Sequence, residues 1–397
     1  MKILHTSDWH LGRQLYGQSR YEEFEAFLDW ILETIETEVI DVLLIAGDVF
    51  DTTSPSNRAQ KLYYNFLCRL PRTSCRHVVI IGGNHDSPSF LNAPKELLRF
   101  LNIHILGQAD EPKKEVIELQ NPDLIVCAVP YLRDRDVRSA KTPQNPAEKQ
   151  ESLIQGIHQH YEDVFAYAQS IQKKRPVIAM GHLFTAGGQT IEGDGVRDLY
   201  VGNLAHVGSR LFADWISYTA LGHLHLPQKV GGRDHVRYSG SPLPMGFGEA
   251  NQQKLVILVE LDSETRIREI PIPVFQKLLS LKGDREILLE AIKSLSPEEP
   301  VWLEIVHTGP ENSLELQEEL LELIQPDIQK ILRFKVKKPR NSGLLFQKHE
   351  SLEDLQHEEV FRRCLKAHEI PEAEYEELLQ AFQMTLDSLD SSKEDQN

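Results

Sequence analysis

Short apolar runs alternate with amphipathic segments along the first 270 residues, a pattern typical of an α/β fold. The runs are rich in Ile, Leu and Val, as expected for strands that are buried on both faces of a sheet. They predict strands at residues 2–6, 41–46, 78–81, 124–129, 177–180 and 218–221. Helical spacing of apolar residues predicts helices at 21–38 and 59–70, and three further strands follow at 236–238, 255–261 and 266–272.

The pattern changes after Pro271, where strands and helices alternate over a shorter stretch. Residues 338–343 combine Pro, Asn, Ser and Gly and therefore read as a linker. Two helical patterns and a polar tail follow, and the composition of the tail predicts disorder. We divide the chain into a large domain at residues 1–274, a small α/β domain at 275–339, and a C-terminal segment at 340–397 that holds the linker, the helices and the tail.

Composition and charge limit the class of protein. Hydrophobic residues make up 41% of the chain and charged residues 26%, as in soluble globular proteins with a sizeable core. The net charge of −17 argues against a protein that holds nucleic acid by bulk positive charge. The acidity is uneven, because residues 271–397 contain 15 Lys and Arg but 26 Asp and Glu.

Other features predict a cytoplasmic location. The four cysteines show neither a metal-ligand spacing nor a disulfide framework, which fits a reducing compartment. No apolar stretch approaches the roughly 20 residues that span a bilayer, so we expect no membrane association. The N-terminus lacks the apolar core of a signal peptide.

Polar side chains gather where the predicted strands end. Five apolar runs end in Ser-Asp-Trp-His, Gly-Asp-Val-Phe-Asp, Gly-Asn-His-Asp, Gly-His-Leu-Phe and Gly-His-Leu-His. Ligands bind at the carboxyl ends of strands in open α/β sheets, so we expect these five segments to converge on one rim. The candidate metal ligands among them are Asp8, His10, Asp48, Asn84, His182, His223 and His225.

The types and spacing of these residues indicate a pair of metal ions. Oxygen and imidazole ligands without thiolate suit divalent ions such as Mn²⁺, Fe²⁺ or Zn²⁺. Asp8 and His10 are two residues apart, so on an extended segment both side chains point the same way, and His223 and His225 repeat that spacing. Any one of these motifs alone is more often a turn or a buried histidine, but five in this order are very unlikely by chance.

The five motifs resemble those of the calcineurin-like metallophosphoesterase superfamily. Within it, the chain resembles the SbcD family, the nuclease subunits of bacterial SbcCD complexes, over nearly its whole length. The opening Met-Lys-Ile-Leu-His-Thr-Ser-Asp-Trp-His-Leu-Gly, the Ala-Gly-Asp-Val-Phe-Asp-Thr segment and the strings at residues 196–202 and 235–242 are typical of that family. The resemblance implies a four-layer αββα metallophosphoesterase sandwich with a small α/β capping domain and C-terminal helices.

The resemblance also implies how the site is built. Asp48 would bridge two ions, one held by Asp8, His10 and His225 and the other by Asn84, His182 and His223. The ions would be Mn²⁺ by resemblance, while the ligand chemistry leaves Mg²⁺, Fe²⁺ and Zn²⁺ open.

Two further residues would act on the proton that hydrolysis must move. His85 is the candidate general acid, because a proton must reach the departing sugar oxygen. Asp51 is its candidate orienting partner, although relatives can carry a histidine there. The alternative for Asp51 is a helix N-cap or a turn residue.

The implied function is that of a Mn²⁺-dependent DNA phosphodiesterase in DNA repair, recombination and replication, on the bacterial nucleoid. With an SbcC-type ABC ATPase, two copies of each subunit would form an ATP-dependent 3'-5' exonuclease on duplex ends and an endonuclease on hairpins and single strands. The alternatives are a phosphomonoesterase or cyclic-nucleotide phosphodiesterase on the same metal core, and a non-catalytic scaffold that brings an ATPase to DNA.

Contacts with DNA and with protein partners are less clearly encoded. Candidate phosphate contacts near the motif loops are Arg13, Arg20, Arg58 and Arg197, with scattered solvated charge as the alternative. Candidate contacts with the coiled-coil base of the ATPase, with intramolecular packing as the alternative, are Val360, Phe361, Leu365, Leu379, Phe382 and Leu386. The family also suggests a homodimer, for which we consider the amphipathic segments at residues 21–38 and 59–70.

Overall fold

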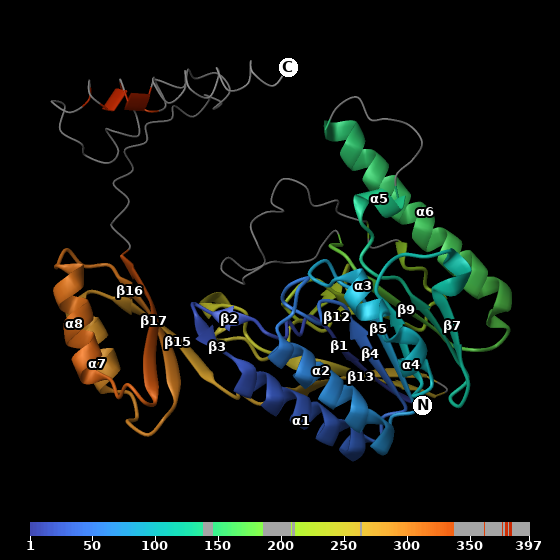
Figure 1. The fold of residues 1–397 in the computed structure, drawn as a ribbon, viewed down its shortest axis with the longest axis horizontal. Helices are drawn as coiled ribbons and strands as arrows, with labels where there is room; N and C mark the ends of the chain where they lie inside the picture. Colours follow the sequence, from blue (N-terminus) through green and yellow to red (C-terminus); the bar gives the residue numbers. More distant parts are fainter. Residues whose placement is uncertain are drawn as a thin grey trace.

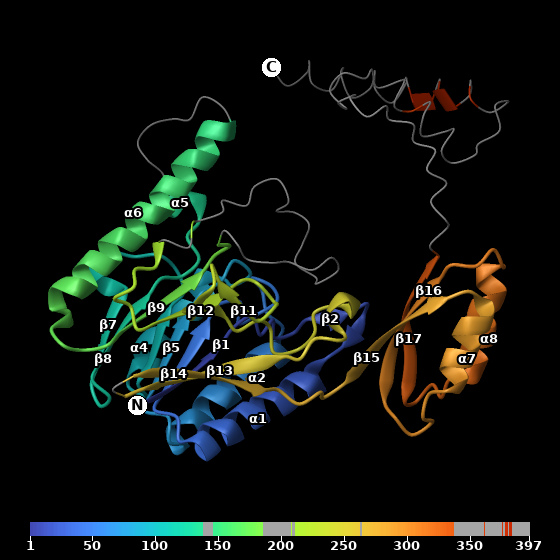
Figure 2. The ribbon, with the colours of Figure 1, turned by 180° about the vertical axis from the view of Figure 1, so that it is seen from behind.

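The computed structural model describes residues 1–137, 146–185, 208, 211–262 and 264–336, together with six single residues near the C-terminus. The large domain holds two six-stranded sheets, and a third sheet of three strands lies apart from them (Figures 1 and 2). None of the described helices is both long and apolar enough to cross a bilayer.

The first sheet has the strand order β14-β13-β1-β4-β5-β6. Its four strands from the first half of the chain run parallel, and the two later strands are added antiparallel at the other edge. The strands in chain order are β1 (Lys2–Thr6), β4 (Val42–Ala46), β5 (His77–Ile81), β6 (Ile103–Leu106), β13 (Leu255–Leu261) and β14 (Thr265–Pro271).

The second sheet has the order β11-β12-β10-β9-β8-β7, with parallel pairing from β12 to β8 and an antiparallel strand at each edge. Its strands are β7 (Val116–Leu119), β8 (Leu124–Ala128), β9 (Val177–His182), β10 (Tyr218–Gly222), β11 (Gln228–Val230) and β12 (Arg233–Tyr238). The predicted strands therefore all form, with ends shifted by up to three residues.

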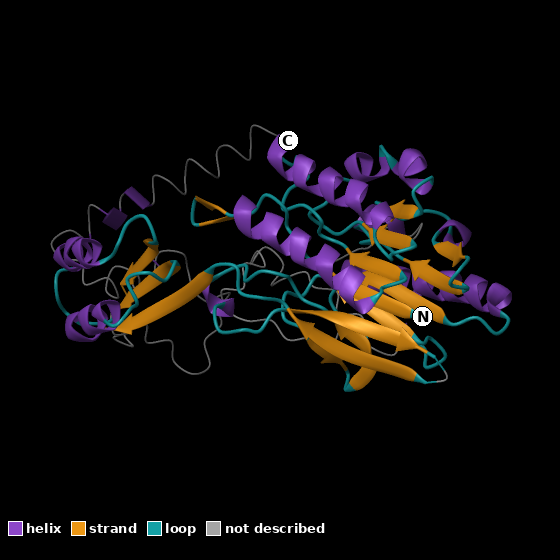
Figure 3. Ribbon diagram, turned by 90° about the horizontal axis from the view of Figure 1, so that it is seen from below, coloured by secondary structure: helices purple, strands orange, loops and turns teal. Residues whose placement is uncertain are grey.

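Alternation along the strands builds the four layers. In β4, Leu44 and Ala46 belong to the core between the two sheets, whereas Leu43 and Ile45 pack against the helices on the outer face. That outer layer is formed by α1 (Tyr21–Glu38) and α2 (Asn57–Arg69), and the opposite layer by α6 (Pro146–Gln172) (Figure 1). Figure 3 shows the same helices and strands from below. This arrangement confirms the αββα sandwich.

The apolar sides of α1 and α2 are already covered. Phe24, Phe27 and Ile31 of α1 are fully buried in the first outer core, together with Tyr63 and Phe66 of α2. These helices therefore stabilise the first sheet, and their contribution to a homodimer stays a prediction.

The small domain is a parallel βαβαβ unit. Its strands β15 (Lys277–Gly283), β16 (Val301–His307) and β17 (Gln329–Val336) pair in that order, and a separate core packs α7 (Arg285–Lys293) and α8 (Ser313–Leu323) on the sheet. Both helices begin at residues whose side chains accept a hydrogen bond from the first turn. The predicted boundary between residues 274 and 275 lies in the connection from β14 to β15.

A small cluster of side chains joins the two domains. The hairpin formed by β2 (Gln14–Leu15) and β3 (Gln18–Ser19) carries Tyr16, whose ring stacks on Phe247 with 5.7 Å between centroids. The Arg333 guanidinium of β17 lies over the same Tyr16 ring, 4.7 Å from its centroid. The hairpin thus positions the small domain beside the large one.

The C-terminal segment is described only in part. Three of the predicted partner contacts, Val360, Leu365 and Leu386, lie outside the described residues. The rings of Phe361 and Phe382 stack with 4.2 Å between their centroids, so these two residues contact each other.

Candidate active site

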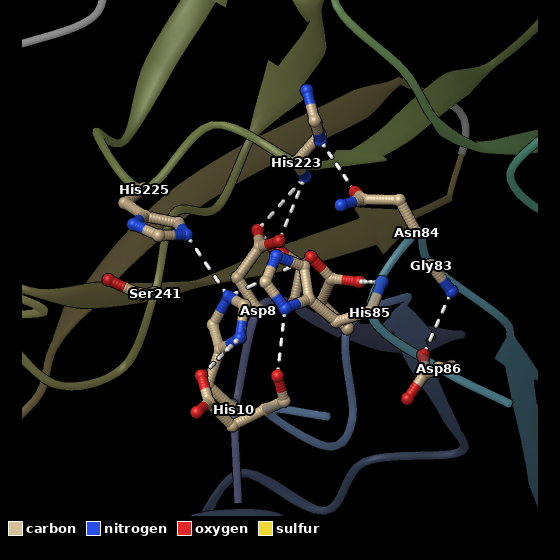
Figure 4. A network of polar contacts seen from close by, with 12 residues as sticks. Asp8, His10, Gly83, Asn84, His85, Asp86, His223, His225 and Ser241 are labelled. Carbon is tan, nitrogen blue, oxygen red and sulfur yellow. Dashed lines mark hydrogen bonds and ion pairs between the residues drawn. The ribbon is translucent and has the colours of Figure 1, made fainter. Parts of the chain in front are cut away.

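The five polar segments come together at the carboxyl ends of β1, β4, β5, β9 and β10, as the sequence predicted. Figure 4 shows Asp8, His10, Asn84, His223 and His225 around a common centre. The loops after β1 and β4 are joined by main-chain hydrogen bonds of 3.0 Å from Asp8 N to Gly47 O and from His10 N to Asp48 O. The site therefore lies on a rim fixed by both sheets.

Glycine is required at two positions of this rim. Gly47 has a φ of +89°, and a Cβ on it would lie 2.2 Å from His182 Nδ1. A Cβ on Gly83 would lie 2.1 Å from Asp48 Oδ1. Both approaches are too close for any side chain, so these glycines make room for the side chains of the candidate ligands.

The first ligand group consists of Asp8, His10 and His225, all buried, with one donor atom of each lying within 4.8 Å of the others. The Nε2 atoms of His10 and His225 are 3.1 Å apart. Asp8 accepts hydrogen bonds from His223 N at 2.9 and 3.1 Å and from Ser7 Oγ at 2.6 Å, which fix the direction of its carboxylate.

The second group consists of Asp48, His182 and His223, again buried and within 4.8 Å. The amide oxygen of Asn84 completes it, at 3.0 Å from His182 Nε2 and 2.9 Å from His223 Nδ1. Because a carbonyl can only accept, the contact of 2.9 Å between His182 Nδ1 and Ala46 O shows that Nδ1 carries a proton, and Nε2 is directed toward the site.

Asp48 lies between the two groups. Its Oδ2 is 3.3 Å from His182 Nε2 in one group and 3.7 Å from His10 Nε2 in the other, while Oδ1 accepts a hydrogen bond of 2.8 Å from His85 N. This is the position that the resemblance assigned to a bridging ligand.

The electrostatics of the cluster suit cation binding. Burial lowers the pKa of His10 to about 4 and that of His223 to about 3, so both rings are neutral at pH 7, the form that binds metals. Burial opposes the charge of Asp48, but the nearby His182 and His10 rings hold its pKa well below the usual range. Burial likewise opposes the charge of His182, yet Asp48 and Asp8 raise its pKa to about 9. The carboxylates thus draw positive charge to the centre of the cluster.

His85 lies at the edge of the cluster, with its ring 4.8 Å from that of His10. Its Nδ1 donates a hydrogen bond of 2.8 Å to the main-chain oxygen of Asp51. The predicted contact between these two residues is therefore present, but it comes from the backbone of Asp51 and not from its carboxylate.

The Asp51 carboxylate faces other groups. Its Oδ1 is 3.1 Å from Arg13 Nη1 and 3.5 Å from His10 Nδ1, and these two partners outweigh burial and lower the pKa of Asp51 to about 2. His10, Asp51 and His85 form a third group of donor atoms within 4.8 Å, but Arg13 already supplies a cation to it. The alternative role as helix cap is also excluded, because Ser56 caps α2.

Asp86 organises the loop after β5, although sequence reasoning did not single it out. Its fully buried carboxylate accepts hydrogen bonds from Val49 N at 3.1 Å, Phe50 N at 3.0 Å and Gly83 N at 2.8 Å, which join the loop after β4 to the loop after β5. Burial raises the pKa of Asp86 to about 6. The only signal for it in the sequence is its place at the end of Gly-Asn-His-Asp.

The predicted DNA contacts differ in their outcomes. Arg20 is 1% exposed, and its guanidinium is held by Glu23 at 2.7 and 2.8 Å and by Pro244 O at 2.6 Å, so its assignment to DNA is wrong. Arg58 is exposed and lies over the ring of Tyr21, and Arg13 contacts Asp51. Arg197 lies outside the described residues.

Two family models match the chain. The calcineurin-like phosphoesterase model matches residues 1–227, and the model of the type 5 capsule protein repressor C-terminal domain matches residues 274–369. The former covers the segments that supply all seven candidate ligands. Given the buried oxygen and imidazole donors described above, the chain carries a divalent metal site.

Relatives of similar length are similar to this chain in sequence. The chain is 37% identical to SbcD, a subunit of the nuclease SbcCD, from Escherichia coli K12 over 398 residues, which cover 98% of each chain. It is 36% identical to the protein of the same name from Rhodobacter capsulatus over 285 residues, 69% of each chain, and 35% identical to that from Bacillus subtilis over 270 residues, 66% of each. The chain therefore belongs to the calcineurin-like phosphoesterase family and, within it, to the SbcD family of SbcCD nuclease subunits.

Proposed function

We propose that this chain is a two-metal DNA phosphodiesterase that works with an SbcC-type ABC ATPase on the nucleoid, as exonuclease on duplex ends (3'-5') and as endonuclease on hairpins and single strands. The convergence of two buried ligand groups on Asp48, with His85 beside them, carries this proposal. The SbcD family membership supports DNA as the substrate and the ATPase as the partner.

We assign the metal ligands as the geometry groups them. Asp8, His10 and His225 would hold one ion and Asn84, His182 and His223 the other, with Asp48 shared. When bound, two divalent ions polarise the phosphate and lower the pKa of a water molecule. We assign Mn²⁺ by family, although the same donors suit other divalent ions.

The protein side chains then handle the proton. The main-chain oxygen of Asp51 holds the Nδ1–H of His85, which fixes the ring and leaves Nε2 to give a proton to the departing sugar oxygen. The Asp51 carboxylate lies beside Nδ1 of His10 and orients this ring, and Arg13 holds the carboxylate in place. In this assignment His85 is the catalytic acid and Asp51 acts through its neighbours.

One assay separates this function from its alternatives. The purified chain with Mn²⁺ is offered hairpin DNA, linear duplex DNA, a chromogenic phosphodiester and the matching monoester, with and without the ATPase partner and ATP. We expect cleavage of the hairpin and the diester by the chain alone, and digestion of duplex ends only with the partner. Turnover of the monoester alone would favour a phosphomonoesterase, and turnover of the chromogenic diester without cleavage of DNA would favour a cyclic-nucleotide phosphodiesterase. If no substrate were turned over, the chain would be a non-catalytic scaffold.

A shortened chain in the same assay tests the C-terminal helices. The proposed contacts with the partner are the apolar residues of these helices, of which Phe361, Leu379 and Phe382 are described. A chain that ends at Gly343 should cleave the hairpin like the full chain but should not respond to the partner. A full response to the partner would assign the contact elsewhere.

We further propose that the chain is a homodimer and that α4 (Lys95–Arg99) forms part of the contact. Leu97 is 71% exposed and Phe100, just after the helix, is 87% exposed, with Leu101 beside them. Large apolar side chains grouped on a surface mark sites of protein association.

A charged substitution in this group is expected to break the dimer. Phe100→Glu should give the mass of one chain, 45.4 kDa, in light scattering, where the unchanged protein gives twice that mass. The matched control is Leu314→Glu, since Leu314 is 70% exposed on α8 of the small domain. A Phe100→Glu protein that stays dimeric would exclude this surface.

A further inference from the structure

In the first ligand group, the Nε2 atoms of His10 and His225 face each other, and a carboxylate lies beside the Nδ1 atom of each ring. Asp51 Oδ1 is 3.5 Å from His10 Nδ1, and Glu249 Oε1 is 3.6 Å from His225 Nδ1. Glu249 comes from the short 3-10 helix η5 (Phe247–Glu249), which no motif of the sequence marks. The two rings are thus flanked in the same way by acids from unrelated parts of the chain.

Glu249 is an unusually buried carboxylate, with no exposed surface. Its Oε2 accepts hydrogen bonds from Met245 N at 3.1 Å and from the Lys254 ammonium group. Its Oε1, by contrast, has no hydrogen-bond partner among the described residues and faces the Nδ1 atom of His225. One oxygen therefore anchors the side chain, and the other is directed at a candidate ligand.

Lys254 contacts both Glu249 and His225 and so links these two residues in addition to their direct contact. It is 4% exposed, and its Nζ donates to His225 O and to Ser241 Oγ, each at 3.1 Å, as well as to Glu249. A buried ion pair adds little stability compared with apolar side chains of the same volume. A pair that contacts both the main chain and the ring of His225 is better explained by the control of that ring.

We propose that Glu249, anchored by Lys254, is a positioning residue that fixes the His225 imidazole for metal binding by accepting its Nδ1 proton. A neutral imidazole has one N–H, so a proton directed at Glu249 leaves the lone pair on Nε2, which faces His10 Nε2 at 3.1 Å. Acids that hold the outer nitrogen of a ligating histidine fix its tautomer and raise its basicity. This inference rests on the proposed metal centre.

Titration of the full chain with Mn²⁺ alone, followed by calorimetry, tests the proposal. The unchanged protein should bind two ions. In Glu249→Gln, the amide N–H₂ group can donate to His225 Nδ1, which favours the tautomer with the proton on Nε2 and blocks the ligating atom. We expect one of the two ions to bind about 10- to 100-fold more weakly, as when other residues that hydrogen-bond to a metal ligand are replaced.

A second variant tests whether the loss of affinity in Glu249→Gln comes from misfolding around the unpaired Lys254. Glu249→Gln combined with Lys254→Met removes the ion pair as a unit and leaves no unpaired buried ammonium group, and it should weaken the same ion. The control is Glu304→Gln, since Glu304 is a buried acid of the small domain that is paired with Lys335 at 2.9 Å. It should bind both ions normally.

The outcomes distinguish this proposal from the proposed function. If the unchanged protein binds two ions and both Glu249 variants bind them with unchanged affinity, the positioning role is wrong while the metal centre stands. If the unchanged protein binds no Mn²⁺, the metal centre and the positioning role both fail. A loss of affinity in Glu304→Gln equal to that in Glu249→Gln would also overturn the specific role of Glu249.

Discussion

Replacement of His85 by alanine is expected to abolish DNA hydrolysis while Mn²⁺ binding stays intact. His85 Nδ1 is bonded to a main-chain oxygen, and the ring stands outside the two groups that we assign as ligands. Loss of a general acid lowers rates by about 10² to 10⁴-fold. Hydrolysis of the chromogenic diester measures the rate, and calorimetry with Mn²⁺ measures whether two ions still bind.

Asp51→Ala provides the matched comparison. The main-chain oxygen that holds His85 stays in this variant, while the carboxylate beside His10 and Arg13 is lost. We therefore expect a smaller fall in rate than for His85→Ala. Full turnover in the His85 variant would refute its role as acid, and weaker Mn²⁺ binding there would make it a ligand.

Replacement of Asp48 by asparagine should remove both metal ions and, with them, the activity. Asp48 is the carboxylate that lies within 3.7 Å of histidine nitrogens from both groups. Asparagine keeps the shape and an acceptor for His85 N but loses the negative charge that a shared ligand needs. Because metal ions supply several kcal/mol of charge stabilisation, we expect a fall of about 10³-fold or more in rate.

The same strand supplies a control for Asp48. Asp41 precedes β4 at its amino end, far along the strand from the site, and its carboxylate accepts a hydrogen bond of 2.9 Å from Lys2 N. Asp41→Asn should keep both ions and the full rate. If Asp48→Asn binds two Mn²⁺ ions as tightly as the unchanged protein, the shared ligand is not Asp48.

Elements with a strong pattern were predictable from sequence. Helix α1 and strand β13 begin and end at the predicted residues. Helix α1 has one apolar side, which packs on the first sheet, and β13 is a nearly continuous apolar run that is buried on both faces. Helix α6 was not predicted from the sequence. Its apolar residues, Tyr161 and Val164 among them, are recognisable as its buried side only where they pack against the second sheet. The short edge strands β6 and β7 have four residues each, too few for a pattern to be clear.

The candidate ligands were predictable for a different reason. Each follows a strand that is buried on both faces, so a polar residue there needs an explanation, and the parallel strands bring the ends together. The role of Asp51 was less predictable, because the atom that holds His85 belongs to the main chain and residue type does not encode it. For Arg20 the residue type itself was misleading. Its charge suggested an exposed contact with DNA, but the side chain is buried and paired with Glu23.

The backbone of the site carries a cost that the rest of the fold must offset. Asp8, His10 and Asp48 have φ angles of 53°, 48° and 48°, in the left-handed region that residues with a side chain rarely adopt. Each such conformation costs about 1 to 3 kcal/mol, a sizeable share of the total stability of about 5 to 15 kcal/mol of a typical protein. The large buried core between the two sheets therefore serves as a reserve of stability, and mutations that weaken this core would reduce the fraction of chains whose ligands are held ready for metal.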